Sequence, residues 1–268
     1  MAEITGGELI LKCLKKEGVK RIIGISDAFY HPVMLNCEKY GIRWVAPRHE
    51  AAGVHIAEGV YKTTGEVPVV MAGAGPGTAN LISGIICARA EGVPVIAITA
   101  QRRREVIYPS KIGVYQGLDQ YDIFKPITKW NAVVHIWERI PEIIQMAFRE
   151  ALAGRPGPVQ IDISETLFYG TGDESKVKIL EPHQYRARAP AEPSASEMEH
   201  IAELIRTAKN PLLIAGTGVL NSNGSHDFLE LVELLNCPAI TSMAARSAIP
   251  NDHPNYVFGY SKAAFAAW

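Results

Sequence analysis

The chain has 268 residues, of which 47% are hydrophobic and 21% charged, and its formal net charge is −1. These values are typical of a globular protein with enough mass for one large or two medium domains. They argue against a nucleic-acid-binding protein, because the only basic cluster is the short run Arg102 to Arg104, which a solvated loop explains. The N-terminal run MAEITGGELILKCLKKEG predicts a short amphipathic helix, so we expect neither a signal peptide nor a membrane span and predict a cytoplasmic protein.

The cysteines give no sign of a zinc site or a disulfide framework. No two of them form a C-x-x-C pair, and they are spread along the chain at Cys13, Cys37, Cys87 and Cys237. We therefore expect them to act as small buried hydrophobic side chains.

Apolar runs that suit strands alternate with segments that suit helices up to residue 164. The predicted strands cover 19–26, 41–47, 67–73, 93–99, 131–136 and 158–164. The predicted helices cover 6–18, 31–40, 50–65, 78–92 and 138–154. This alternation predicts an α/β domain with a parallel sheet, and the continuous apolar strands indicate that helices cover both of its faces.

The composition changes after this region. Periodicity is lost from Thr166 to Pro193, and 186–195 is rich in Pro, Ala and Ser, which indicates a linker after a first domain of residues 1–185. Alternation resumes in 196–268 with two helices and two strands. Because so few elements cannot cover both faces of a sheet, we expect a second α/β domain that is completed by further sequence or by a partner.

A glycine-rich turn, MAGAGPGTAN, follows the third predicted strand and opens a helix. Such a turn brings backbone amides and a helix N-terminus close to a ligand, or it is only a tight turn. Its G-x-G-x-G spacing differs from the G-x-G-x-x-G of dinucleotide folds, and the next strand ends in Gln101 and three arginines rather than an acid. A reductase that binds NADP through an arginine therefore remains an alternative.

Glu50 in RHEAAGVHIAEG raises a separate question. At helical spacing it lies one turn before the apolar stripe of Val54, Ala57 and Tyr61, on the core side. It is either an acid of the first turn that complements the helix dipole, or a carboxyl in a mostly apolar pocket with a raised pKa and a task in proton transfer.

The order of several motifs resembles the acetolactate synthase-like thiamine diphosphate enzymes. These motifs are RHE before a helix with A-E-G, the GPGTANLISG turn, VYQG with the following DIFKPITKW run, and GPVQIDI before the linker. The resemblance covers residues 1 to about 185 as the pyrimidine-binding domain of that family, and the remainder is similar to the start of its central domain. It implies a lyase, decarboxylase or carboligase that acts through a C2 ylide on a 2-oxo acid, an aldehyde or an acyloin.

The resemblance also implies roles for individual residues. Glu50 matches the catalytic glutamate that hydrogen-bonds N1′ of the cofactor's aminopyrimidine ring, and Gln116 matches the active-site glutamine that faces the reacting carbon. Pro76, Gly77 and Asn80 match the part of the turn that lies at the cofactor and positions the loop of Gln116.

Two motifs depart from the pattern of the family's carboligases, so acetolactate synthesis itself is in doubt. The loop after the first strand reads GISDA instead of a Gly-x-Pro-Gly type, and YQG replaces Phe-Gln-Glu. Possible substrate contacts are Ser26, His31, His49 and Tyr115, although a lone histidine after a strand is more often structural.

The family's Mg²⁺ and diphosphate ligands have no counterpart in this sequence. The nearest match, Gly172, Asp173 and Glu174, lacks the second glycine of the G-D-G motif. The resemblance therefore implies a diphosphate end in missing sequence, and a homodimer or homotetramer with active sites between subunits. The turn from Gly216 to Gly218 leaves FAD or ADP binding undetermined, and a non-catalytic interaction subunit remains a further alternative.

Overall fold

The computed structural model describes residues 3–107, 111–186 and 192–259. The chain divides into two compact units, Met1–Ala187 and Arg188–Trp268. Part of the linker predicted at 186–195 falls outside the described residues.

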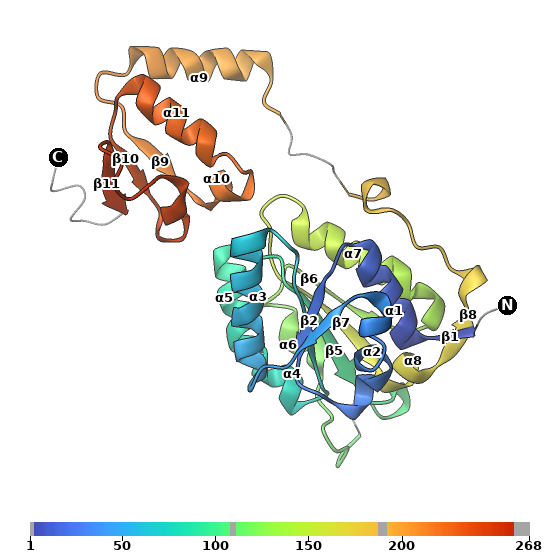
Figure 1. Ribbon diagram of the computed structural model, residues 1–268. Coiled ribbons are helices and arrows are strands. Elements are labelled where there is room, and N and C mark those ends of the chain that lie inside the picture. The colour runs from blue at the N-terminus through green and yellow to red at the C-terminus, as the bar shows by residue number, and fades with distance from the viewer. Residues whose placement is uncertain (1–2, 108–110, 187–191, 260–268) are drawn as a thin grey trace. The chain divides into compact units, whose positions relative to one another are not determined.

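The first unit is built on a six-stranded parallel sheet with the strand order β3-β2-β4-β5-β7-β6 (Figure 1). Its strands are β2 (Arg21–Gly24), β3 (Arg43–Val45), β4 (Val69–Ala72), β5 (Ile96–Gln101), β6 (Trp130–Val134) and β7 (Val159–Ser164). Every residue of β4, β5 and β7 is buried, as the continuous apolar runs predicted. The predicted parallel α/β fold is confirmed.

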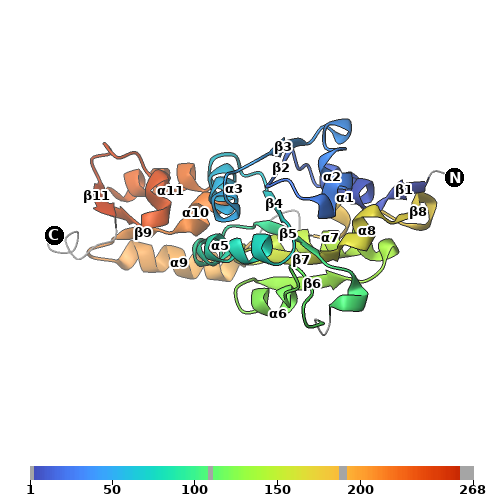
Figure 2. The ribbon, with the colours of Figure 1, turned by 90° about the horizontal axis from the view of Figure 1, so that it is seen from below.

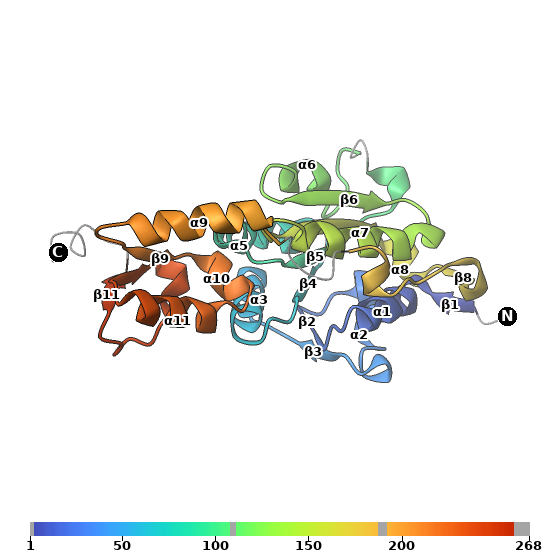
Figure 3. The same cartoon turned by 90° about the horizontal axis from the view of Figure 1, so that it is seen from above.

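Helices cover both faces of this sheet. They are α1 (Gly6–Lys16), α2 (His31–Met34), α3 (Glu50–Thr64), α4 (Pro76–Asn80), α5 (Ile82–Glu91), α6 (Gln120–Phe124), α7 (Ile140–Leu152) and α8 (Glu165–Tyr169). On one face α1 and α7 pack side by side (Figure 3), and on the other α3 packs against α5 (Figure 2). Two separate hydrophobic clusters result, one under each helical layer.

The predicted helices mostly have the expected extents, with two differences. The segment 31–40 forms α2 and then a short 3-10 turn at Glu38–Tyr40, instead of one helix. The segment 78–92 is divided at Leu81 between α4 and α5, and α4 begins earlier than predicted, at Pro76. Proline suits this first helical position because no intrahelical acceptor is available for an N–H there.

The stretch 166–193, predicted without periodicity, contains short elements among its described residues, and one of them pairs with a strand near the N-terminus. β8 (Thr171–Asp173) pairs antiparallel with β1 (Glu3–Thr5). Beside this pair, Lys12 of α1 forms an ion pair of 2.5 Å with Glu174. The start and the end of the first unit are therefore joined by a strand pair that is only three residues long.

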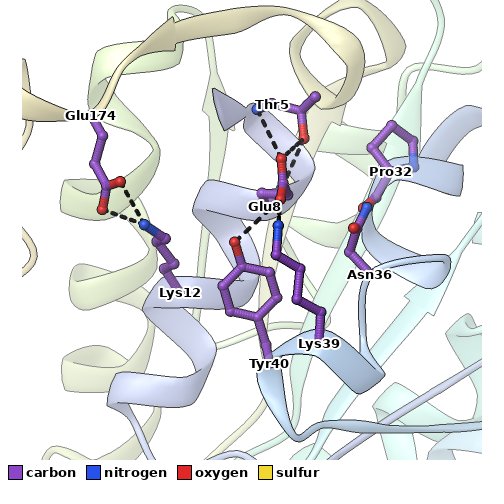
Figure 4. A network of polar contacts seen from close by, with 8 residues as sticks. All are labelled: Thr5, Glu8, Lys12, Pro32, Asn36, Lys39, Tyr40 and Glu174. Atoms are coloured by element: carbon purple, nitrogen blue, oxygen red, sulfur yellow. Dashed lines mark hydrogen bonds and ion pairs between the residues drawn. The ribbon is translucent and has the colours of Figure 1, made fainter. Parts of the chain in front are cut away.

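The side chain of Glu8 organises the start of α1 (Figure 4). Thr5 and Glu8 form a capping box, in which the Glu8 amide donates to the Thr5 hydroxyl over 3.1 Å. The Glu8 carboxylate also accepts from the Lys39 ammonium over 2.6 Å and from the Tyr40 hydroxyl over 3.3 Å. These contacts hold the pKa of Glu8 below its usual value, first of all through the hydrogen bond from Lys39.

The second unit has a parallel sheet of three strands in the order β11-β10-β9, which are β9 (Leu213–Ala215), β10 (Ala239–Thr241) and β11 (Tyr256–Gly259). Its helices are α9 (Ala195–Thr207), α10 (Thr217–Asn221) and α11 (Ser225–Leu235), with α9 and α11 on opposite sides of the sheet (Figure 3). The core cluster is small, with Val232, Ala239 and Ile249 as its buried members. No residue of α9 is buried.

Candidate active site

The glycine-rich turn lies at the carboxyl edge of the six-stranded sheet. It directly follows β4 and leads into α4, whose first residue is Pro76. Gly75, the residue before it, has φ of +63°, a backbone conformation that glycine adopts without a steric penalty. The neighbouring strands β2 and β5 end at the same edge, at Gly24 and Gln101. The loops after them are therefore able to reach the turn.

Gln116 lies directly against the middle glycine of the turn. A Cβ atom added to Gly75 would lie 2.6 Å from the carbonyl oxygen of Gln116 and 3.0 Å from its Cα. Gln116 has φ of +60°, which is uncommon outside glycine and costs on the order of 1 kcal/mol or more. Its surroundings therefore hold this backbone in place, while the preceding Tyr115 is 77% exposed.

The two outer glycines accommodate carboxylates from two further loops. A Cβ atom at Gly73 would overlap the Oδ2 atom of Asp27, and one at Gly77 would lie 3.3 Å from the Oε1 atom of Glu50. The G-x-G-x-G spacing is thus explained by close approach, because each alternate residue of the turn faces a group from a different loop. This arrangement differs from a dinucleotide loop, in which the glycines leave space for a pyrophosphate.

Glu50 is the first residue of α3 and is half-buried. Its Oε2 atom accepts a hydrogen bond of 3.0 Å from the side-chain amide of Asn80. The apolar stripe predicted on α3 is present, since Val54 and Ala57 are fully buried. Glu50 lies at the outer end of that stripe, so within this chain its carboxyl is not enclosed in an apolar pocket. A position in the first helical turn is also electrostatically favourable for a carboxylate.

His49 has a local structural role next to Glu50. It is the N-cap of α3, where its Nδ1 atom accepts a hydrogen bond of 3.2 Å from the amide of Ala51. An accepting Nδ1 fixes the tautomer in which Nε2 carries the proton. Its ring is thereby oriented by the helix it caps.

Tyr30 lies close to both carboxylates of the site. Burial raises the pKa of its hydroxyl, and the negative charges of Asp27 and Glu50 raise it further. The hydroxyl donates to the carbonyl oxygen of Ile25, and the Asp27 Oδ1 atom accepts from the Phe29 amide over 3.0 Å. The loop after β2 is thus tied together at the site.

The remaining substrate-side candidates lie on the same loop. Ser26 is exposed, and His31, the first residue of α2, is half-buried. Asp27 and Tyr30 were not among the predicted site residues. The GISDA departure in the loop was visible in the sequence, yet no local pattern shows that the Asp27 carboxylate would meet a glycine of another loop.

The chain belongs to the thiamine pyrophosphate enzymes. Residues 4–123 match the family model described as the N-terminal TPP binding domain of these enzymes, and residues 198–267 match the model of their central domain. The resemblance seen in the order of motifs is confirmed. These matches give no support to the NADP reductase alternative.

Among curated proteins, the chain is similar to acetolactate synthases. It is 34% identical over 257 residues to the probable acetolactate synthase large subunit of Methanocaldococcus jannaschii, covering 94% of this chain and 42% of that protein. It is 35% identical over 255 residues to the acetolactate synthase isozyme 1 large subunit of Escherichia coli, covering 93% of this chain and 43% of that protein. The chain therefore spans less than half the length of these relatives.

The chemistry of the described residues fits one end of thiamine diphosphate. A half-buried carboxyl at a cluster of loops can meet a ring nitrogen, and Asn80 holds one of its oxygens in place. For the metal end the fit is poor. Within the described parts of the chain, the one group of side chains with metal-ligand spacing is His226, Asp227 and Glu230, all exposed on α11. Asp173, from the partial G-D-G match, accepts instead from the amide of Ser175.

Among the described helices, none is both long and apolar enough to cross a membrane.

Proposed function

We propose that this chain is the part of a thiamine diphosphate-dependent lyase or carboligase that binds and activates the aminopyrimidine ring of the cofactor. The enzyme would act on a 2-oxo acid, an aldehyde or an acyloin-type compound. The observation that carries the proposal is the convergence of Glu50, Gln116 and the Pro76–Asn80 segment on one turn, in a chain of this family.

Glu50 is the proton-holding residue in this proposal. The bound cofactor supplies a nucleophilic carbon that attacks carbonyl groups. Glu50 shares a proton with the ring nitrogen N1′, and the hydrogen bond from Asn80 leaves Oε1 as the carboxyl oxygen free for that contact. The half-buried state of Glu50 within this chain suits a carboxyl that becomes enclosed when the ring and the rest of the enzyme cover it.

Gln116 and the loop after β2 form the substrate side in this proposal. The left-handed backbone of Gln116 and its contact with Gly75 fix the position of its Cα atom and the direction of its Cα–Cβ bond. Ser26, His31 and Tyr115 are candidates to contact substrate, whereas the Nδ1 atom of His49 is used as a helix cap. Asp27 adds a carboxylate, so this side would disfavour a substrate with a second negative group there.

We further propose that Mg²⁺ and the diphosphate are bound by sequence outside this chain. The relatives are more than twice as long, and among the described residues the one group of His, Cys, Asp and Glu side chains with metal-ligand spacing is exposed on α11. A homodimer or homotetramer with sites between subunits would bring the two ends together. FAD or ADP binding by the central domain stays undetermined.

The test is the exchange of the cofactor's C2 proton for deuterium in the enzyme as it occurs in its source. A Glu50→Gln variant should exchange at least about a hundredfold more slowly than the wild type, since a general acid or base contributes roughly 10²–10⁴-fold. Glu91→Gln is the matched control, because Glu91 is an exposed acid that pairs with Lys62. An unchanged rate in Glu50→Gln would remove the catalytic role. A wild type without any exchange would favour the non-catalytic interaction subunit.

A further inference from the structure

A buried polar network lies directly beneath the glycine-rich turn. Its centre is Gln120, the first residue of α6, which has no exposed surface. The Gln120 Oε1 atom accepts a hydrogen bond of 2.8 Å from the amide of Gly75. Its Nε2 atom donates to the carbonyl oxygen of Ala100 over 3.0 Å and to Asp162 Oδ1 over 2.6 Å. Both polar ends of this side chain are therefore used, which fixes the orientation of its amide.

Asp162 is the second member of the network. It lies within β7, is fully buried, and also accepts from the Thr99 hydroxyl over 2.9 Å. The side-chain Nε2 atom of Gln101 donates to Asp162 Oδ2 over 3.4 Å and to the carbonyl oxygen of Leu118 over 2.9 Å. A carboxylate in the middle of a sheet is costly unless donors surround it, as they do here.

Two contacts of this network reach the backbone on either side of the Gly75–Gln116 contact. Gln120 reaches the turn at Gly75, and Gln101 reaches Leu118, two residues after Gln116. Gln116 packs on Gly75 with its backbone in the left-handed region. Because the left-handed backbone of Gln116 is costly, neighbouring contacts must hold it. The network supplies two of them: Gln120 binds the amide of Gly75, and Gln101 binds the carbonyl oxygen of Leu118. An apolar core at the same place would stabilise the sheet without fixing these two backbones.

We propose that Gln120 and Asp162 are positioning residues, which set the contact between Gly75 and Gln116 and thereby aim Gln116 at the reacting carbon. This inference rests on the proposed function for the role of Gln116. Neither residue touches the cofactor or the substrate in this proposal, so both act through the turn and the loop.

The first test is amide hydrogen exchange in the intact enzyme. A Gln120→Met variant keeps the size of the side chain and loses the acceptor for Gly75. We expect the Gly75 amide to exchange about tenfold faster, because a buried hydrogen bond is worth on the order of 1.4 kcal/mol. Gln145→Met is the matched control, since Gln145 is a buried glutamine on α7, away from the turn. An unchanged rate at Gly75 would overturn the inference.

The second test is rescue by exchange of charge. Gln120→Glu alone places two carboxylates against each other and should lower kcat about tenfold or more, since small misplacements of catalytic groups have effects of up to about a hundredfold. Adding Asp162→Asn removes the second carboxylate and keeps an acceptor for Gly75, but the carbonyl oxygen of Ala100 loses its donor from residue 120. We expect this double variant to recover part of the lost kcat. A double variant no faster than Gln120→Glu alone, with normal folding by circular dichroism, would contradict the inference.

A third comparison separates this inference from the proposed function. In a Gln116→Ala background, Gln120→Met should lower kcat much less than in the wild type, since both changes then affect the same step. Fully additive losses would contradict positioning through Gln116. Suppose that Glu50→Gln leaves C2 proton exchange unchanged while Gln120→Met still speeds exchange of the Gly75 amide. The proposed function then fails, but the hydrogen bond from Gly75 to Gln120 still holds the turn. The reverse pattern rejects the positioning inference alone.

Discussion

The molecule contains two glycine-rich turns that look alike in the sequence and differ in the structure. Both follow a parallel strand and open a short helix, at 73–77 after β4 and at 216–218 after β9. In the first turn, a Cβ atom on any of the three glycines would meet a residue from another loop. In the second, a Cβ atom on Gly216 or Gly218 would meet nothing within 4 Å.

This difference shows what glycine does in each unit. At 73–77 the missing side chains leave space for Asp27, Gln116 and Glu50, so three other segments of the chain meet at this turn. At 216–218 the structure gives no such requirement. The two units also differ in their cores. The first has two extensive hydrophobic clusters, whereas the single cluster of the second has three buried residues. The role of a glycine-rich turn is therefore best judged from the residues that lie where the missing Cβ atoms would be.

The largest effect is expected for Gly75→Ala. A methyl group there would combine the left-handed backbone with overlap against Gln116, so we expect a loss of about 2–4 kcal/mol in the free energy of unfolding. Gly65→Ala is the matched control, because Gly65 has φ of +70° with nothing within 4 Å and should cost only about 1 kcal/mol. Denaturant unfolding measures both. Equal losses would show that the contact with Gln116 is unimportant.

The next effect concerns the pH dependence of the first unit. Glu17 is enclosed by Tyr185 and by Arg186, whose guanidinium lies 3.1 Å away. Burial raises its pKa from 4.5 to about 7, against the opposing charge of Arg186. Because the folded-state pKa is raised, the stability contributed by the neutral form is complete below about pH 4.5 and is lost as the pH rises to about 7.

A Glu17→Gln variant should remove this dependence. Its free energy of unfolding should fall less than that of the wild type between pH 4.5 and 7, the window set by the two pKa values. Thermal unfolding at a series of pH values measures it. Parallel curves for the two proteins would mean that Glu17 is ionised and well paired throughout.

A smaller effect is expected for Asn80→Ala. It removes the hydrogen bond to Glu50 Oε2 and leaves α4 otherwise intact. We expect C2 proton exchange to slow by about tenfold, the factor for one hydrogen bond to a charged group. If exchange is as fast as in the wild type, Asn80 does not orient Glu50 during the reaction.

The smallest effect is expected in the second turn. Gly218→Ala should leave the stability unchanged or raise it by up to about 1 kcal/mol, because Gly218 lies within α10 and alanine favours helices. A loss as large as that of Gly75→Ala would show that the second turn also faces an essential group.

Most of the sheet could be predicted from the sequence, because its central strands are continuous apolar runs buried on both faces. The pairing of β1 with β8 could not be predicted, since each strand has three residues and the partners lie at opposite ends of the unit. Short strands carry no periodicity that distinguishes them from a loop. The pattern around HPVMLNCEKY suited one helix, but the chain turns after Met34.

For the candidate site, the order of motifs predicted which segments belong to it, but the contacts between side chains of separate loops could not be predicted. The order of motifs indicated Glu50, Gln116 and the turn. Nothing local indicated that Asp27 would face Gly73 or that Gln120 would bind the Gly75 amide 45 residues away. Such contacts depend on strand order and on rotamers, which residue spacing does not record.

We propose that Glu50 shares a proton with N1′ of the cofactor. The most direct measurement is the ¹⁵N NMR shift of N1′ in thiamine diphosphate labelled at that atom and bound to the complete enzyme. We predict a shift toward the protonated value in the wild type and its loss in Glu50→Gln. If N1′ bound to the wild type has the shift of the free, unprotonated cofactor, Glu50 does not share a proton with it.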